Sequence, residues 1–132
     1  MNEQESDANR IEIYALRLKE RAVRDMDSAY IRFAELVSPE VADQWRDGLQ
    51  NAIAGLAYNP RRHSLAPENF QREVRQIVYR RSGSKVAYRI LFTITGELEG
   101  SQDAPTVTIL HVRHASSRPM TRTQSRQIES EE

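Results

Sequence analysis

Apolar residues recur with two different periods along the chain. Between positions 19 and 37 they return every three or four residues, which is typical of an amphipathic helix with one buried stripe. A second stretch with this spacing runs from position 39 to about 57. Ser38 and Pro39 suit the N-cap and first turn of that second helix, and Asn59-Pro60 ends it. Because the connection is so short, we expect the two helices to form an antiparallel hairpin.

Strand patterns flank this predicted hairpin. A short run rich in β-forming residues, positions 11–17, precedes it. After a loop, three further strands are expected over 73–81, 86–95 and 106–114. Alternation is clearest in the second of these, where Tyr88, Ile90 and Phe92 share one face and Arg89 lies on the other.

The order of these elements predicts an α+β fold. We expect an N-terminal strand and a helical hairpin packed on one face of a small, mainly antiparallel four-stranded sheet. The opposite face should stay partly open, with Arg89 projecting towards it. We expect residues 1–9 to form a disordered acidic tail, 10–118 the folded domain, and 119–132 a flexible polar tail.

Composition removes several classes of function. The sequence has no cysteine, which excludes a disulfide framework, a thiolate nucleophile and a cysteine zinc site. The three histidines are scattered, so no metal site is expected, and without a glycine-rich phosphate loop no cofactor is expected either. Apolar stretches are too short to span a bilayer. We therefore expect a soluble, cytoplasmic protein that does not contact a membrane.

The zero formal net charge conceals a segregation of charge. Both ends of the chain are acidic, whereas positions 60–95 hold eight basic residues and only two acidic ones. Nearly all of the basic residues are arginine, whose planar guanidinium suits phosphates and carboxylates. The pattern indicates a basic, β-rich half that meets an anionic partner, or, on the alternative interpretation, arginines that are solvated or ion-paired within the fold.

Several runs together resemble a known family. LAPENFQREVRQIVY, VAYRILFTI and VTILHVRHASSR are similar to the C-terminal half of RelE/ParE toxins, in which a helical hairpin precedes them as it does here. The resemblance covers roughly residues 11–118. The chain departs from the family in a longer loop, 96–105, and in its acidic N-terminal extension.

The resemblance implies the toxin of a type II toxin–antitoxin pair, which inhibits growth and is neutralised by a cognate antitoxin. RelE-like members are metal-independent, ribosome-dependent mRNA endonucleases. ParE-like members inhibit DNA gyrase and are not enzymes. The partners implied are therefore the antitoxin, with the ribosome and mRNA or DNA gyrase as the target. A non-toxic, non-enzymatic relative that acts only as a protein-binding module is the alternative.

The nuclease hypothesis selects particular residues. Metal-free RNA cleavage needs a base, an acid and cations that stabilise the phosphorane. We predict Arg89 for phosphate stabilisation and His114 as the acid or base, since imidazole titrates near neutrality. Arg75 and Arg118 would complete a cationic cup, and Arg113 could contact the RNA backbone.

Structural alternatives stand beside these roles. Arg89 could instead pair with Glu68 or Glu73, and His114 could cap a strand end and donate a hydrogen bond to a backbone carbonyl. On the nuclease hypothesis, the same two glutamates could serve as the base. Lysines are scarce, which weakens that hypothesis. By alternation His111 falls on the core-facing side of its strand and reads as a packed core histidine.

Overall fold

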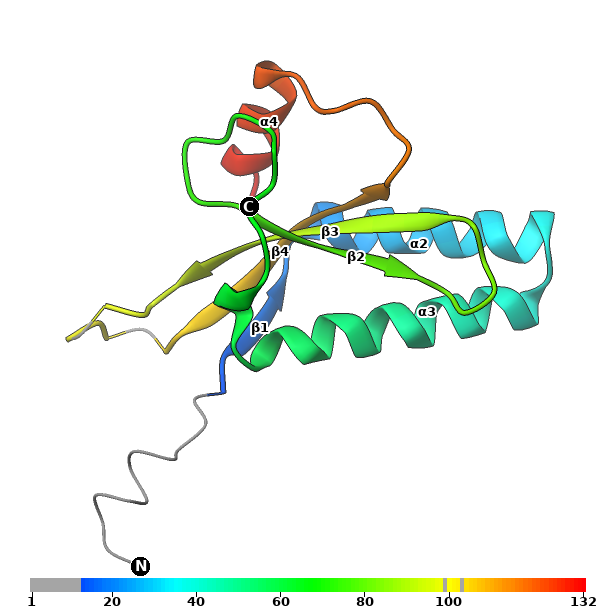
Figure 1. The fold of residues 1–132 in the computed structure, drawn as a ribbon, viewed down its shortest axis with the longest axis horizontal. Helices are drawn as coiled ribbons and strands as arrows, with labels where there is room; N and C mark the ends of the chain where they lie inside the picture. The colour runs from blue at the N-terminus through cyan, green and yellow to red at the C-terminus, as the bar shows by residue number, and fades with distance from the viewer. Residues whose placement is uncertain (1–12, 99, 103) are drawn as a thin grey trace, which may run out of the picture.

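The computed structural model describes residues 13–98, 100–102 and 104–132, and it has the expected α+β fold (Figure 1). In chain order the elements are β1 (Ala15–Leu18), α2 (Glu20–Leu36), α3 (Pro39–Ala54), the 3-10 turns η1 (Gly55–Ala57) and η2 (Pro60–Arg62), β2 (Arg75–Arg80), β3 (Ala87–Thr95), β4 (Thr106–His114) and α4 (Arg122–Ser130). The predicted strands and helices are confirmed to within a few residues. Positions 11 and 12 of the first predicted strand lie outside the described residues.

The helical hairpin of α2 and α3 begins and turns as the sequence predicts. The Ser38 hydroxyl accepts a hydrogen bond from the Val41 N–H at 3.1 Å, and Pro39 occupies the first turn of α3. At Gly48 the helix meets β2 so closely that a Cβ would lie 2.1 Å from the Tyr79 hydroxyl oxygen. That hydroxyl donates to the Trp45 carbonyl at 3.1 Å, which ties α3 to the sheet. Within the described part of the chain, no helix is long and apolar enough to cross a membrane.

The sheet has the strand order β1-β4-β3-β2, with β1 parallel to β4 and the other pairs antiparallel. The β3–β4 register shifts by one residue, because Leu91 lies opposite His111 whereas Phe92 lies opposite Ile109. Leu110 is therefore the extra residue of a β-bulge. A bulge interrupts the alternation of side chains, so His111 does not share the face of Ile109 as the sequence pattern predicted.

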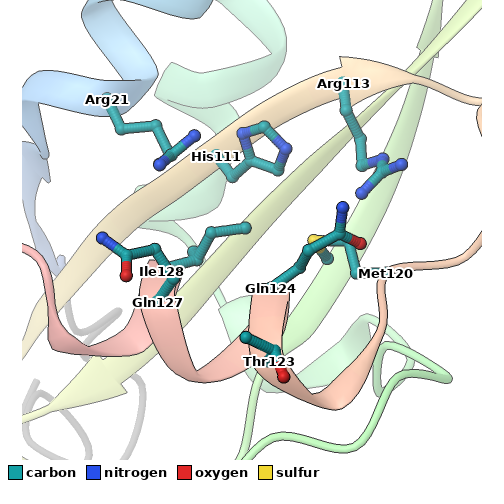
Figure 2. A pocket seen from close by; sticks show the side chains of 8 residues that line it. All are labelled: Arg21, His111, Arg113, Met120, Thr123, Gln124, Gln127 and Ile128. Atoms are coloured by element: carbon teal, nitrogen blue, oxygen red, sulfur yellow. The ribbon is translucent and has the colours of Figure 1, made fainter.

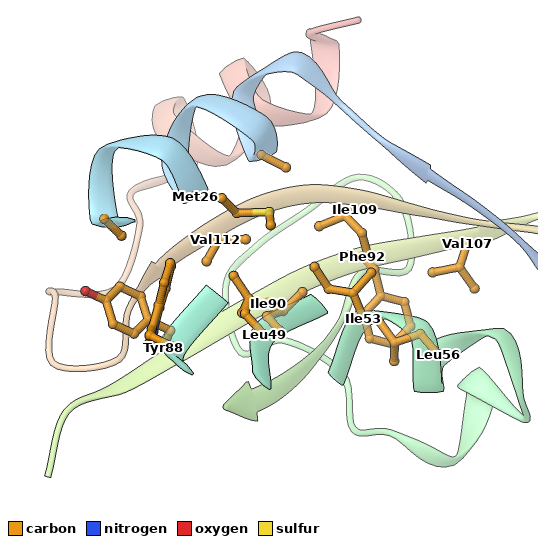
Figure 3. Close-up of a cluster of buried hydrophobic side chains, with 13 residues drawn as sticks. Met26, Leu49, Ile53, Leu56, Tyr88, Ile90, Phe92, Val107, Ile109 and Val112 are labelled. Carbon is orange, nitrogen blue, oxygen red and sulfur yellow. The ribbon is translucent and has the colours of Figure 1, made fainter. Parts of the chain in front are cut away.

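The main core lies between the hairpin and one face of the sheet (Figure 3). Its centre is aromatic: the Trp45 ring packs 5.2 Å from Phe33 and 5.1 Å from Tyr88, measured between ring centroids. The buried members are Ala22, Met26, Ala29, Trp45, Leu49, Ile53, Leu56, Tyr88, Ile90, Phe92, Val107, Ile109 and Val112.

The prediction of a flexible tail over 119–132 is wrong for residues 122–130, which form α4 on the side of the sheet away from α3 (Figure 1). The helix begins with a capping box, in which Thr121 accepts from the Gln124 N–H and the Gln124 side chain accepts from the Thr121 N–H. Ile128 is buried in a second cluster formed with Met120, Val74, Leu91 and Leu110. Two apolar residues eight positions apart made too sparse a stripe to predict this helix.

Charged groups tie the C-terminal end of α4 to the rest of the domain. The Lys19 ammonium donates to the carbonyls of Ile128 and Glu129 at 3.3 Å each, at the C-terminal end of α4. The Glu129 carboxylate accepts the backbone N–H groups of Gln71 and Arg72 at 2.8 Å each. The second face of the sheet is therefore partly covered by α4 and the 66–72 loop, and clefts remain on it between these segments and the strands.

Candidate functional site

Three of the four residues predicted for RNA cleavage are divided between the two faces of the sheet. Arg75 lies opposite Phe92 and His114 lies opposite Tyr88, so both belong to the hairpin side of the sheet. Arg89 follows Tyr88 in β3 and projects to the other face. Arg75 and His114 are therefore separated from Arg89 by the sheet.

Arg89 is buried and occupied by an internal ion pair. Its two terminal nitrogens donate to the Glu68 carboxylate at 2.7 and 2.6 Å, and Nε donates to the Gln76 amide oxygen at 2.7 Å. These hydrogen bonds from Arg89 outweigh the opposing effect of burial and lower the pKa of Glu68 from 4.5 to about 2. Arg89 therefore forms the internal ion pair with Glu68 that was the alternative to phosphate binding. Glu68 has a structural role.

Arg75 holds the loop that precedes β2. It donates to the backbone carbonyls of Arg61 at 3.1 Å and His63 at 2.5 Å, and it pairs with Glu73. Arg61 in turn pairs with Glu97, and hydrogen bonds from Arg61 lower the pKa of that carboxyl. The arginines at this end of the sheet act within a surface ion-pair network.

His114 and Arg118 bracket the turn after β4. Nδ1 of His114 accepts a hydrogen bond from the Ser116 N–H at 3.1 Å. The ring therefore caps the strand end as the structural alternative predicted, but its partner is a backbone N–H and not a carbonyl. The ring also packs 5.4 Å from Tyr88. The backbone carbonyl of Arg118 accepts a hydrogen bond from Arg113 at 2.7 Å. One side of His114 opens onto an apolar groove of about 190 Å³ beside the C-terminal end of α2.

A larger cleft, of about 390 Å³, lies between α4, β4 and the start of α2 (Figure 2). Within it His111 is placed between Arg21 and Arg113, and α4 supplies the facing wall. The residues that line it are Arg21, His111, Arg113, Met120, Thr123, Gln124, Gln127 and Ile128.

The orientation of the His111 ring in this cleft is set by a carboxylate of α2. Nδ1 of His111 lies 2.6 Å from the Asp25 carboxylate, and the same carboxylate oxygen accepts the Val112 N–H at 3.0 Å. The sequence pattern indicates no role for Asp25, and it predicts a core position for His111. Neither the bulge at Leu110 nor the packing of α4 has a simple sequence signature, so this cleft could not be derived from the periodicity of β4.

Comparison with known proteins identifies the family. Residues 16–119 match the model of the family described as "ParE toxin of type II toxin-antitoxin system, parDE". A solved structure of a chromosomal ParDE toxin–antitoxin system from P. aeruginosa superposes with a TM-score of 0.58 at 17% identity, covering 78% of this chain and 97% of that chain. A search of curated proteins finds no match. Since the family model spans most of the chain, the protein belongs to the ParE toxin family of type II toxin–antitoxin systems.

Proposed function

We propose that this toxin inhibits growth by binding DNA gyrase, without cleaving RNA, and that a cognate antitoxin neutralises it. The proposal is carried by the interactions that three candidate nuclease residues make within the fold. Arg89 forms an ion pair with Glu68, and Arg75 binds backbone carbonyls and pairs with Glu73. The His114 ring accepts a backbone N–H in the turn after β4. Gyrase, as the target of ParE-like toxins, requires no such catalytic cluster.

Releasing Arg89 for phosphate binding would be unfavourable. Its side chain is 10% exposed and that of Glu68 is 1% exposed, so breaking the pair would leave an uncompensated charge in a buried position. Such a loss typically costs about 3–5 kcal/mol. Glu68 also cannot serve as a general base near neutrality, because a carboxyl with a pKa of about 2 is a weak proton acceptor.

The antitoxin contact is proposed for the exposed apolar end of α2. Leu36 is 76% exposed and Val37 is 61% exposed, and both line the apolar groove beside His114. Phe33 and Tyr88 continue the same groove. A soluble monomer rarely leaves such residues uncovered, and the partner of a type II toxin is the molecule expected to cover them.

Purified protein and gyrase provide the direct test. We expect the toxin to inhibit supercoiling by gyrase and to trap DNA breaks, and the co-purified antitoxin to restore supercoiling. A Leu36→Asp toxin should resist this rescue, with Glu35→Gln on the same helix as the matched control. Unaffected supercoiling, together with transcripts cleaved on the ribosome, would favour the nuclease alternative. Normal growth on expression without antitoxin would favour the non-toxic binding module.

A further inference from the structure

The cleft beneath α4 presents hydrogen-bond donors from three elements. On β4, the Arg113 guanidinium is the donor, and Asp25 occupies Nδ1 of His111, which leaves Nε2 of that ring facing the cleft. On α4, the Gln124 side-chain oxygen is used by the capping box, which leaves its amide N–H groups as donors. The Gln127 amide and the Arg21 guanidinium line the same space.

Arg113 is a positive charge of the cleft that no carboxylate of the described residues pairs with. Arg21 pairs with Glu131 at 2.5 Å and His111 with Asp25 at 2.6 Å. Among the described residues, Arg113 has no carboxylate within ion-pair distance, and its buried Nε has no hydrogen-bond partner. Within the described part of the chain, the hydrogen bond that its side chain makes is the donation to the Arg118 carbonyl at 2.7 Å.

The electrostatic surroundings of Arg113 favour the binding of an anion. Burial is the main cause that lowers the pKa of this guanidinium, and the neighbouring Arg89 adds repulsion. The carboxylates of Glu68 and Asp25 oppose these effects without cancelling them. The pKa of an arginine stays far above neutrality even so, and the side chain remains charged. An anion bound at Arg113 would therefore compensate a charge that the fold leaves partly desolvated.

From this arrangement we infer a binding site for a phosphate-bearing small molecule of nucleotide size, in which Arg113 contacts the phosphate and His111 lines the site. Donors that approach from β4, α4 and α2 match the several oxygens of a tetrahedral phosphate better than the two coplanar oxygens of a carboxylate. The cleft volume of about 390 Å³ exceeds what a phosphate alone would fill, and such volumes are common for small-ligand sites. The inference is independent of the target of the toxin.

This site would also couple the ligand to α4. Thr123, Gln124 and Gln127 belong to a segment beyond residue 119, where the family match ends. A ligand held between these side chains and Arg113 would bind the docked state of α4 more tightly than a state with α4 detached. By mass action the ligand would then stabilise the docked helix.

Binding of two probes to the full chain tests the inference. Inorganic phosphate and a nucleoside 5′-monophosphate are titrated by calorimetry, and amide hydrogen exchange of α4 is followed in parallel. We expect saturable binding of both, tighter for the nucleotide, with slower exchange across 122–130. Arg113→Gln should weaken binding about tenfold or more, as expected for the loss of charge-assisted hydrogen bonds. Arg46→Gln, which removes the same charge from the surface of α3, should leave binding unchanged.

A second variant distinguishes loss of ligand binding from loss of folding. Gln127→Ala shortens a side chain that makes no hydrogen bond to another described side chain or backbone group, and it should weaken nucleotide binding several-fold while the circular dichroism spectrum is retained. Absence of binding for both probes would overturn the inference. Binding that survives Arg113→Gln and Gln127→Ala unchanged would do the same, because it would place the anion elsewhere.

Discussion

The Glu68–Arg89 pair makes the free energy of unfolding depend on pH, and this dependence can be measured. Hydrogen bonds from Arg89 lower the pKa of Glu68 from 4.5 to about 2 in the folded protein. Each pKa unit corresponds to about 1.4 kcal/mol of differential interaction, so the ionised carboxylate contributes about 3 kcal/mol to the free energy of unfolding. Both side chains are nearly buried, at 10% and 1% exposure, so solvent screens the pair only weakly.

The pH window follows from the sign of the shift. A carboxyl whose folded-state pKa is depressed contributes fully above its unfolded pKa, near 4.5, and loses that contribution as the pH falls through about 2. We therefore expect Glu68→Gln to lower the free energy of unfolding by about 3 kcal/mol or more at pH 7. The variant and the wild-type protein should converge as the pH falls from about 5 towards 2.

Urea unfolding followed by circular dichroism, at intervals between pH 7 and pH 2, measures this difference. Glu35→Gln, an exposed glutamate on α2, is the matched control and should track the wild-type protein at every pH. A Glu68→Gln difference that stays constant with pH would refute the reasoning, because it would mean that packing, and not the ionised carboxylate, carries the effect. A difference below about 1 kcal/mol at pH 7 would place the pair in the class of surface salt bridges.

Three further predictions concern packing and recognition. Gly48→Ala should destabilise the fold by about 1–3 kcal/mol in urea unfolding, since the new Cβ would meet the Tyr79 hydroxyl at 2.1 Å; Gly55→Ala, with open space around it, should not. Ile128→Ala should cost about 2–4 kcal/mol and make the 119–132 segment sensitive to limited proteolysis, whereas the exposed Arg122→Ala should do neither. Leu36→Asp should keep the wild-type urea midpoint and weaken antitoxin binding at least tenfold in calorimetry, and unchanged affinity would reject the apolar groove as the antitoxin site.

The sequence predicted the elements that depend on local periodicity. The final strand was expected over 106–114 and runs over Thr106–His114, because alternating apolar residues require one face of the strand to be buried. The α3 start was set by Ser38 and Pro39, whose capping geometry is local. The α4 helix was missed since its stability comes from Ile128 and Met120 packing on the sheet, and tertiary packing is not encoded in a short polar segment.

The candidate site was less predictable for the same reason. Sequence spacing allowed Arg89 either a substrate phosphate or an internal carboxylate, and the choice depends on where the loop carrying Glu68 folds. The cleft at His111 and Arg113 depends on a bulge at Leu110 that offsets the strand by one residue. A one-residue offset changes which face a side chain occupies, and alternation alone cannot reveal it.

The central claim, that this ParE-family toxin acts on DNA gyrase and not on RNA, is tested most directly in a single induced culture without antitoxin. DNA breaks trapped on gyrase and the 5′ ends of transcripts are mapped from the same cells. We expect gyrase-linked breaks to accumulate while messages stay intact. Cleaved messages, with DNA and supercoiling unchanged, would contradict it.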